Sequence, residues 1–356
     1  ERGLALDPQH ANSWGRLGQL QRTLGHHQAA IDAYRKAIEI DPAYGWAHNG
    51  CGLALRALGR PAEALLSFKR AARFQPEIVW HWYNLTETLT ELGHYEDAVE
   101  VAREAVRVDP AHAFSWAKLG QVLRYLKRFD ESLAAYQRSL VLQPESAWAC
   151  NGKGIVLEQL GRFEEALAAY QRASALAPRD VWPAYNQGSV LIALGRPGDA
   201  RVALEHALTL LPTHARSMAL LGTALHQLGD LEAARAAFES AVALDAGASW
   251  AWNEYGQVLR KLGFESEALE AMQRAGTPAP GETVLVFEQA DLLMAQERFD
   301  EAIRLLEGYL IDKPRSQYGW AKLGQALRRL RRYDEAIRAC DRALELDPGY
   351  AWAWNV

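Results

Sequence analysis

The sequence is poor in cysteine and contains no long apolar run. Cys51, Cys150 and Cys340 lie far apart and form no Cys-x-x-Cys pair, so neither a disulfide framework nor a zinc knuckle is expected. No apolar stretch approaches the length of a membrane-spanning helix, and no signal peptide precedes the first regular segment. We therefore expect a cytoplasmic protein that does not contact a membrane.

Motifs for catalysis and cofactor binding are also missing. The sequence has no Gly-x-Ser-x-Gly turn, no phosphate-binding Gly-x-x-x-x-Gly-Lys loop, no His-Glu-x-x-His pair and no Cys/His cluster with metal-ligand spacing. We expect no enzyme activity, no cofactor and no metal, and we assign no catalytic residue. A formal net charge of −5 gives the chain no overall attraction to nucleic acid.

The sequence does have a strict period of 34 residues. Prolines recur at this spacing, with one double interval where Ala246 stands instead, at Pro8, Pro42, Pro76, Pro110, Pro144, Pro178, Pro212, Pro280, Pro314 and Pro348. Counting from the third residue after each of these sites gives ten complete repeats over residues 11–350. Residues 1–10 would then end a preceding helix B, and residues 351–356 would begin an eleventh repeat, so both ends look cut within a repeat.

Each repeat is expected to form two helices joined by a tight turn. Positions 8 and 20 are small in nearly every repeat, as at Gly154 and Ala166, which lets the two helices approach closely. Position 15 is usually glycine, as at Gly161, which suits the left-handed residue at a helix end. We expect helix A over about positions 2 to 14. Helix B should run from an acidic first turn near Arg162 to the proline near position 32.

This pattern resembles the tetratricopeptide repeat. Trp116-x2-Leu119-Gly120-x2-Leu123, Ser132-x3-Tyr136 and Pro144 match its Trp-x2-Leu-Gly-x2-Tyr, Ala-x3-Phe and Pro signature, and the match recurs along nearly the whole chain. The resemblance implies an all-α fold, a right-handed superhelical solenoid of helix-turn-helix repeats. It also implies that positions 2, 5, 9, 12 and 13 of helix A face a concave groove, whereas position 4 packs inward. The array further resembles those of bacterial signalling NTPases of the STAND type and caspase-like proteins.

A period of 102 residues lies within the 34-residue period. The segments that start at Ser13, Ser115 and Gly319 are nearly the same, and Trp-Ala-x-Asn recurs at Trp46, Trp148, Trp250 and Trp352. Duplication of a three-repeat block explains this pattern by itself. An extended partner that presents similar features at regular intervals is the other explanation.

All twelve tryptophans stand at position 2 or position 4. The position-4 set is expected to pack against helix B, and consists of Trp14, Trp82, Trp116, Trp252, Trp320 and Trp354. The position-2 set either covers the preceding turn or contacts a partner. We predict a partner-binding groove that comprises Trp46, Trp80, Phe114, Trp148, Trp182, Trp250, Tyr318, Tyr83, Tyr185, Arg22, Lys118, Gln121, Arg124, Arg260, Lys322, Gln325 and Arg328.

The same face is expected to be basic. Positions 2, 5, 6, 9, 12 and 13 carry eleven basic and six acidic residues, a net charge of +5, which leaves −10 on the rest of the chain. Lys118, Gln121 and Arg124 are spaced by three residues along one helical stripe. Such a stripe suits acidic side chains of a partner, and the alternative is a solvated face. The family's carboxylate clamp is not assembled, because Asn84 and Asn186 lack its other members.

Two irregularities occur near the C-terminal end. The segment 276–281 ends repeat eight early, and either a hinge or a frayed helix end explains it. Tyr309 stands where the other repeats have alanine or serine, so we expect a weakened interface there.

These observations predict a protein-interaction scaffold or sensor module that binds an extended or acidic protein segment in its groove. A nucleic-acid-binding solenoid is one alternative, because basic residues interleaved with aromatics can track a phosphate backbone. An accessory array of a larger enzyme, whose catalytic domain lies outside this chain, is the other. Self-association through uncapped ends is a further expectation.

Overall fold

The computed structural model describes residues 9–276 and 283–356, and these contain α-helices and no strand. The A helices are α2 (Ala11–Thr23), α4 (Gly45–Ala57), α6 (Val79–Glu91), α8 (Ala113–Tyr125), α10 (Ala147–Gln159), α12 (Val181–Ala193), α14 (Ala215–Leu228), α16 (Ser249–Lys261), α18 (Thr283–Ala295), α20 (Gln317–Arg329) and α22 (Ala351–Asn355). The predicted all-α class is confirmed.

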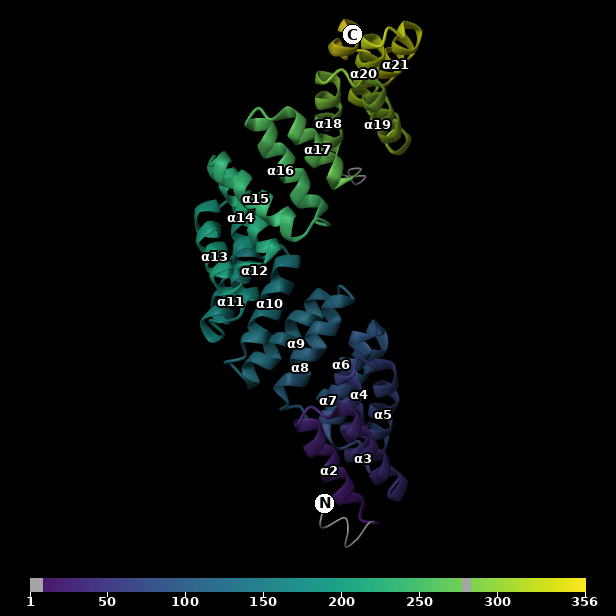
Figure 1. The fold of residues 1–356 in the computed structure, drawn as a ribbon, viewed down its shortest axis with the longest axis vertical. Helices are drawn as coiled ribbons and strands as arrows, with labels where there is room; N and C mark the ends of the chain where they lie inside the picture. Colours follow the sequence, from purple (N-terminus) through teal and green to yellow (C-terminus); the bar gives the residue numbers. More distant parts are fainter. Residues whose placement is uncertain (1–8, 277–282) are drawn as a thin grey trace. The chain divides into compact units, whose positions relative to one another are not determined.

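The B helices alternate with the A helices along the chain. They are α3 (His27–Ile40), α5 (Pro61–Phe74), α7 (Tyr95–Val108), α9 (Phe129–Leu142), α11 (Phe163–Leu176), α13 (Pro197–Leu210), α15 (Leu231–Leu244), α17 (Glu265–Ala275), α19 (Phe299–Asp312) and α21 (Tyr333–Leu346). Successive helices are in contact within each unit, from α2 to α10 in the first and from α13 to α21 in the second (Figure 1). Helix A begins one residue earlier than expected, and helix B usually ends two residues before the proline position.

Helix A and helix B of one repeat meet through a glycine and a large side chain. At Gly154 a β-carbon would lie 2.5 Å from the Tyr170 ring, and at Gly52 it would lie 2.7 Å from Phe68. The alanines at position 20, such as Ala166, are fully buried in the same contact. The prediction that positions 8 and 20 permit close approach is therefore confirmed, and in these repeats glycine is needed at position 8 because its neighbour occupies the β-carbon's place.

Contacts divide the chain into two compact units, residues 1–186 and 187–356, and the sequence did not predict this division. The first unit has a continuous core that includes Tyr34, Phe68 and Val99. The second has its own core around Phe238, Met272 and Leu306. In the residues that the structure covers, no helix is both long and apolar enough to span a bilayer.

Tryptophans at position 4 of helix A form hydrogen bonds with the turn that precedes this helix. The indole Nε1 of Trp82 donates a hydrogen bond to the Pro76 carbonyl at 2.7 Å, and Trp116 bonds Pro110 in the same way at 2.9 Å. Trp252 is buried. The structural role expected for this set is thus confirmed, with one exception, because Trp354 is 71% exposed beside the short α22.

The two irregular regions have different outcomes. Helix α17 has 11 residues, whereas the other B helices have 14, so repeat eight does end early. The hinge expected at 276–281 falls almost wholly on residues outside those described. The weakened interface expected between repeats eight and nine stays a prediction; the Tyr309 ring itself packs against Phe287 at 5.0 Å and beside Gly319, whose missing side chain leaves the space.

The three cysteines differ in burial. Cys51 and Cys150 are buried, but Cys340 is only half-buried, because the short α22 covers it incompletely. Burial raises the pKa of all three thiols, which disfavours the reactive thiolate.

Position 15 is left-handed even where it is not glycine. Gly161 has φ +72°, and Lys127, Glu297 and Arg331 take the same conformation at φ 57° to 60°. A residue with a β-carbon costs about 1 kcal/mol in this region.

We expect Lys127→Gly to raise the free energy of unfolding, and Gly161→Ala to lower it, by about 1 kcal/mol each. No atom lies within 4 Å of the β-carbon that Gly161→Ala would add, so only the backbone conformation is tested. Urea unfolding followed by circular dichroism measures both changes. Destabilisation by Lys127→Gly would show that the lysine side chain, and not its φ angle, sets the stability of this turn.

Candidate functional site

The aromatic residues at position 2 fall into two groups. Trp46 and Trp352 are half-buried, and Trp46 stacks on Tyr44 of the preceding turn at 5.9 Å. The others keep between 39% and 48% of their surface exposed, and these are Trp80, Phe114, Trp148, Trp182, Trp250 and Tyr318. The first group covers the preceding turn, which is one of the two roles that the sequence left open for position 2. The second group presents a large apolar surface to solvent.

Three rings form one exposed cluster in the first unit, which we call the aromatic strip: Trp80, His112 and Phe114. His112 lies 4.6 Å from Trp80 and 5.8 Å from Phe114, and Trp80 and Phe114 are 6.2 Å apart. The His112 ring is fixed by a 2.7 Å hydrogen bond with Ser115. Because α6, the turn before α8 and α8 itself supply one ring each, the strip bridges two repeats.

Lys118 was predicted to lie on an exposed basic stripe, and this is wrong. The residue is 6% exposed. Its ammonium lies 3.3 Å from the Glu87 carboxylate and 3.0 Å from the Gln121 carbonyl oxygen. The rings of Tyr83 and Trp148 lie 5.5 and 5.0 Å away, within range of a cation–π interaction. Lys118 therefore has its partners within the chain.

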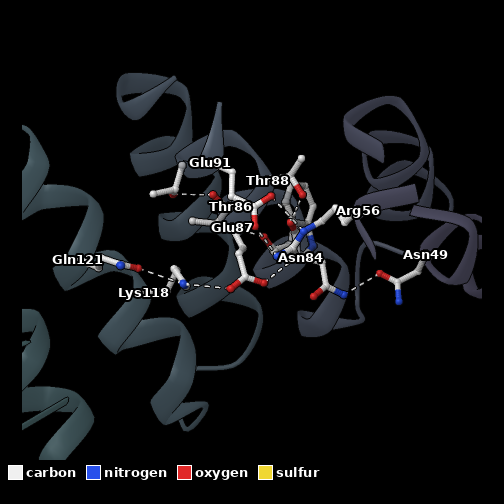
Figure 2. Close-up of polar contacts among 11 residues, drawn as sticks. Asn49, Arg56, Asn84, Thr86, Glu87, Thr88, Glu91, Lys118 and Gln121 are labelled. Atoms are coloured by element: carbon white, nitrogen blue, oxygen red, sulfur yellow. Dashed lines mark hydrogen bonds and ion pairs between the residues drawn. The ribbon is translucent and has the colours of Figure 1, made fainter. Parts of the chain in front are cut away.

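Glu87 also pairs with the preceding repeat. Its second oxygen accepts a hydrogen bond from Arg56 at 2.6 Å, and Arg56 bonds Glu91 at 2.6 Å as well. Figure 2 shows these carboxylates between the two cations, with Arg56 on α4, Glu87 on α6 and Lys118 on α8. The chain of ion pairs consequently crosses three consecutive A helices, and it pairs two of the eleven basic residues of this face with two of its six acidic residues.

Burial and the neighbouring charges act against each other on the pKa values of Glu87 and Lys118. Burial alone would raise the pKa of Glu87, but the charges and hydrogen bonds of Lys118 and Arg56 outweigh it and lower that pKa. Burial also lowers the pKa of the Lys118 ammonium, and Glu87 offsets only part of this effect. The pKa of Tyr83 is raised to about 12 by burial, with Glu87 as the second cause. Glu87 thus remains the carboxylate that both cations share.

The second unit contains a similar arrangement 204 residues later. Lys322 is 5% exposed, and its ammonium lies 2.6 Å from Asp291. The rings of Tyr318 and Trp352 lie 5.3 and 5.6 Å from it. The exposed position expected for Lys322 is therefore wrong for the same reason as for Lys118.

The remaining predicted residues are only partly available. Arg260 pairs with Glu288 at 2.9 Å, and Arg124 stacks on its neighbour Tyr125 at 4.6 Å. Arg328 is exposed, and the half-buried residues of the predicted set are Arg22, Tyr83, Tyr185, Gln121 and Gln325. Sequence reasoning did not predict the internal pairing, although Glu or Asp at position 9 followed 31 residues later by Lys at position 6 was a signal for it.

The asparagines at position 6 also bind within the chain. Asn84 donates to the Asn49 carbonyl oxygen, and Asn186 donates to Asn151, both at 2.9 Å. This agrees with the expectation that they do not form a carboxylate clamp. Over residues 9–276 and 283–356, no three His, Cys, Asp or Glu side chains are arranged to hold a metal ion.

We expect Glu87→Ala to lower the free energy of unfolding by about 2 kcal/mol, because it leaves the buried Lys118 ammonium without its carboxylate. Combining it with Lys118→Met removes that charge and should restore about half of the loss. Urea unfolding provides the measurement, with Glu91→Ala as the control, since Glu91 is exposed and its loss should cost under about 1 kcal/mol. A double variant no more stable than Glu87→Ala would contradict the pairing.

Comparison with known proteins shows which family of repeats this chain resembles. Sequence models of the tetratricopeptide repeat match residues 11–44, 45–65, 82–112, 112–179, 181–246 and 287–351. No curated protein matches the sequence. A tetratricopeptide repeat protein from Parabacteroides merdae is 18% identical at a TM-score of 0.56, covering 70% of this chain and 98% of its own.

A second solved structure, PilF of Pseudomonas aeruginosa, is also 18% identical, at a TM-score of 0.52, and covers 58% of this chain and 94% of its own. At these identities the likeness shows the fold alone. The matched ranges cover most of the sequence, and the helix pairs repeat every 34 residues. The chain therefore belongs to the tetratricopeptide repeat family, whose members generally mediate protein–protein interactions.

Proposed function

We propose that this chain is a protein-interaction scaffold that binds an extended protein segment along the A helices of its first unit. The aromatic strip, together with Trp148 of the next repeat, forms the main contact surface. The observation that carries the proposal is that Trp80, Phe114 and Trp148 stay 39% to 48% exposed while the charged groups beside them are paired and largely buried. Exposed rings in fixed positions are typical of binding hot spots.

The rings suit an extended segment because they recur with the repeats. Each lies near the start of an A helix, and successive A helices of this unit are in contact. Tyrosine and tryptophan bury a large area at little cost in conformational entropy. Ring contacts within the strip already restrict Trp80, so binding requires little further ordering.

The ion pairs of the first unit restrict which side chains a bound partner segment can present there. Arg56 and Lys118 share Glu87 within the chain, so a partner carboxylate at this place would have to displace it. Acidic partner residues have more available cations in the second unit, where Arg328 and Arg329 form no ion pair within the part that the structure describes. We accordingly propose that the first unit binds an apolar or aromatic segment of the partner, and that acidic side chains of the partner bind to the second unit.

The proposal predicts that Trp80→Ala combined with Trp148→Ala weakens capture by about 100-fold or more, because each ring is expected to contribute about 2 kcal/mol. The probes are peptides selected from a random library displayed on phage against the wild-type chain, and anisotropy of the labelled peptides reports affinity. Tyr333→Ala is the matched control, since it removes an exposed aromatic from a B helix. Helix content and melting temperature should stay unchanged in both proteins.

Selection of no peptide, or of peptides that bind the double variant as well as the wild type, would argue against the proposal. Peptides that lose affinity equally in the Tyr333→Ala control would show a surface other than the A helices.

Nucleic-acid binding is the alternative that the sequence left open. It needs several unpaired cations close together, whereas the cations of the first unit beside the aromatic strip are paired. We expect labelled single-stranded DNA and RNA to show no binding at about 50 mM salt in an anisotropy titration. Binding in the micromolar range with a steep salt dependence would favour this alternative instead.

The wider setting of the chain is also a proposal. The resemblance to arrays of bacterial signalling NTPases and caspase-like proteins supports a cytoplasmic sensor module that recruits a partner to a catalytic domain elsewhere. We propose that the chain itself is not an enzyme and needs no cofactor. Assaying a longer protein that includes flanking sequence, with and without these repeats, would test the accessory role.

A further inference from the structure

The second unit contains a cavity of about 500 Å³ beside an exposed tryptophan. It lies among the starts of α14 and α16, the end of α15 and the turn between α15 and α16. Trp250 and Asn253 line it from α16, Arg216 and Ala219 line it from α14, and Ala248 lines it from the turn. Most of the other lining residues are alanine or glycine. Its volume is within the range of small-ligand sites.

The residues 204 positions earlier in the sequence, in the first unit, indicate which side chain fits this cavity. Nearly every lining residue has the same or a similar counterpart there, including Trp46 for Trp250 and Asn49 for Asn253. The largest difference is that Tyr44 stands where the cavity has Ala248.

Tyr44 fills the space in the first unit. Its ring stacks on Trp46 at 5.9 Å and an interplanar angle of 29°, and its hydroxyl donates a weak hydrogen bond to Asn12 at 3.4 Å. It lies 3.1 Å from the place of a β-carbon on Gly15. Near the end of the chain Tyr350 stands at the same repeat position, 6.2 Å from Trp352. Ser146 stands at the same place before Trp148, so tyrosine fills this place in two of the four blocks, and the cavity at Ala248 is the same place without a tyrosine.

Three differences adapt the empty site to a ligand from outside. Trp250 is 40% exposed, whereas its counterpart Trp46 is covered by Tyr44 and half-buried. Arg216 replaces Asn12, the residue that receives the Tyr44 hydroxyl. Ala219 replaces Gly15, so a ring must sit slightly farther from α14 than Tyr44 does.

Asn253 adds a polar group that lacks a partner. Its counterpart Asn49 accepts a hydrogen bond from Asn84, but the residue equivalent to Asn84 is Glu288, whose carboxylate is not a donor. The Asn253 carbonyl oxygen is buried and has no hydrogen-bond partner in the described part of the chain. A donor supplied by a ligand would satisfy it.

We propose that this cavity binds a tyrosine side chain of a partner segment, with the ring stacked on Trp250 and the phenol oxygen accepting a hydrogen bond from Arg216. A neutral phenol fits better than an anion, because the Asp245 carboxylate also lines the cavity. The inference rests on the proposed function, since the tyrosine belongs to the extended segment that the A helices bind, and it adds a side-chain specificity that the aromatic strip does not supply.

The test uses one substitution that fills the cavity at Ala248 and another that opens the equivalent place at Tyr44. N-acetyl-tyrosinamide is titrated into ¹⁵N-indole-labelled protein, and the Trp250 signal, identified with Trp250→Phe, reports binding. Ala248→Tyr should weaken binding at least 10-fold without lowering the melting temperature, because its ring occupies the place that Tyr44 occupies in the first unit. Tyr44→Ala should open a second site, visible at Trp46. Ala219→Leu fills the cavity from α14 and serves if Ala248→Tyr does not fold.

Arg216 is tested by comparing N-acetyl-tyrosinamide with N-acetyl-phenylalaninamide. The wild type should prefer the tyrosine compound several-fold, and Arg216→Ala should remove the preference while retaining the ring. Unchanged binding in both cavity-filling variants, or no binding in the wild type, would overturn the proposal.

The outcomes also separate this inference from the proposed function. Loss of peptide capture in the Trp80/Trp148 variant, with tyrosine binding absent, would reject the cavity alone. Tyrosine binding that Ala248→Tyr blocks, in a chain that selects no peptides, would reject the scaffold function instead.

Discussion

The contact between glycine at position 8 and a large side chain at position 24, present in most repeats, is the constraint on which the rest of this structure depends. At Gly154 and Gly222 the partner ring occupies the space of a β-carbon, so the A and B helices of a repeat are as close as their backbones allow. This contact fixes the rotation of helix A about its axis. Positions 2, 5, 6, 9, 12 and 13 then fall on one side of every A helix, and neighbouring repeats present equivalent residues to one another.

Neighbouring repeats interact through side chains whose sequence separation reflects that geometry. The ion pairs Arg56–Glu87 and Glu87–Lys118 each join residues 31 apart, and Asn49–Asn84 joins residues 35 apart. Repeats of this kind are stabilised by their own core and by contacts with their neighbours. A charge that the sequence places on the A-helix face is therefore as available to the next repeat as to a ligand.

This availability explains what the sequence predicted and what it did not. The helices and the close approach at Gly154 and Ala166 were predictable from the 34-residue period and its small residues, and the inward packing of Trp82 and Trp116 was predictable from the resemblance to the tetratricopeptide repeat. The burial of Lys118 was not predicted. Its burial depends on whether the long Lys118 side chain reaches Glu87 in the preceding repeat. The periodicity of residue types does not determine this contact.

Some outcomes depended on single neighbours. Tyr309 departs from the alanine or serine of the other repeats, and Gly319 leaves room for its ring, so these two departures from the pattern fit each other. The turns at Lys127 and Arg331 are left-handed although glycine is absent, which shows that helix packing on both sides sets this conformation and that glycine only makes it less costly.

The 102-residue block supplies an internal reference for judging the candidate sites. Where the blocks agree, as in the hydrogen bonds His10–Ser13, His112–Ser115 and His214–Ser217, the shared residues hold turns and need no ligand to explain them. Where blocks differ in an otherwise similar setting, as at Ser146 and Ala248 in the place of Tyr44 and Tyr350, the shared fold does not account for the change. Duplication thus explains the similarity between blocks, and the departures are the better guide to binding, because only they differ while the fold around them stays the same.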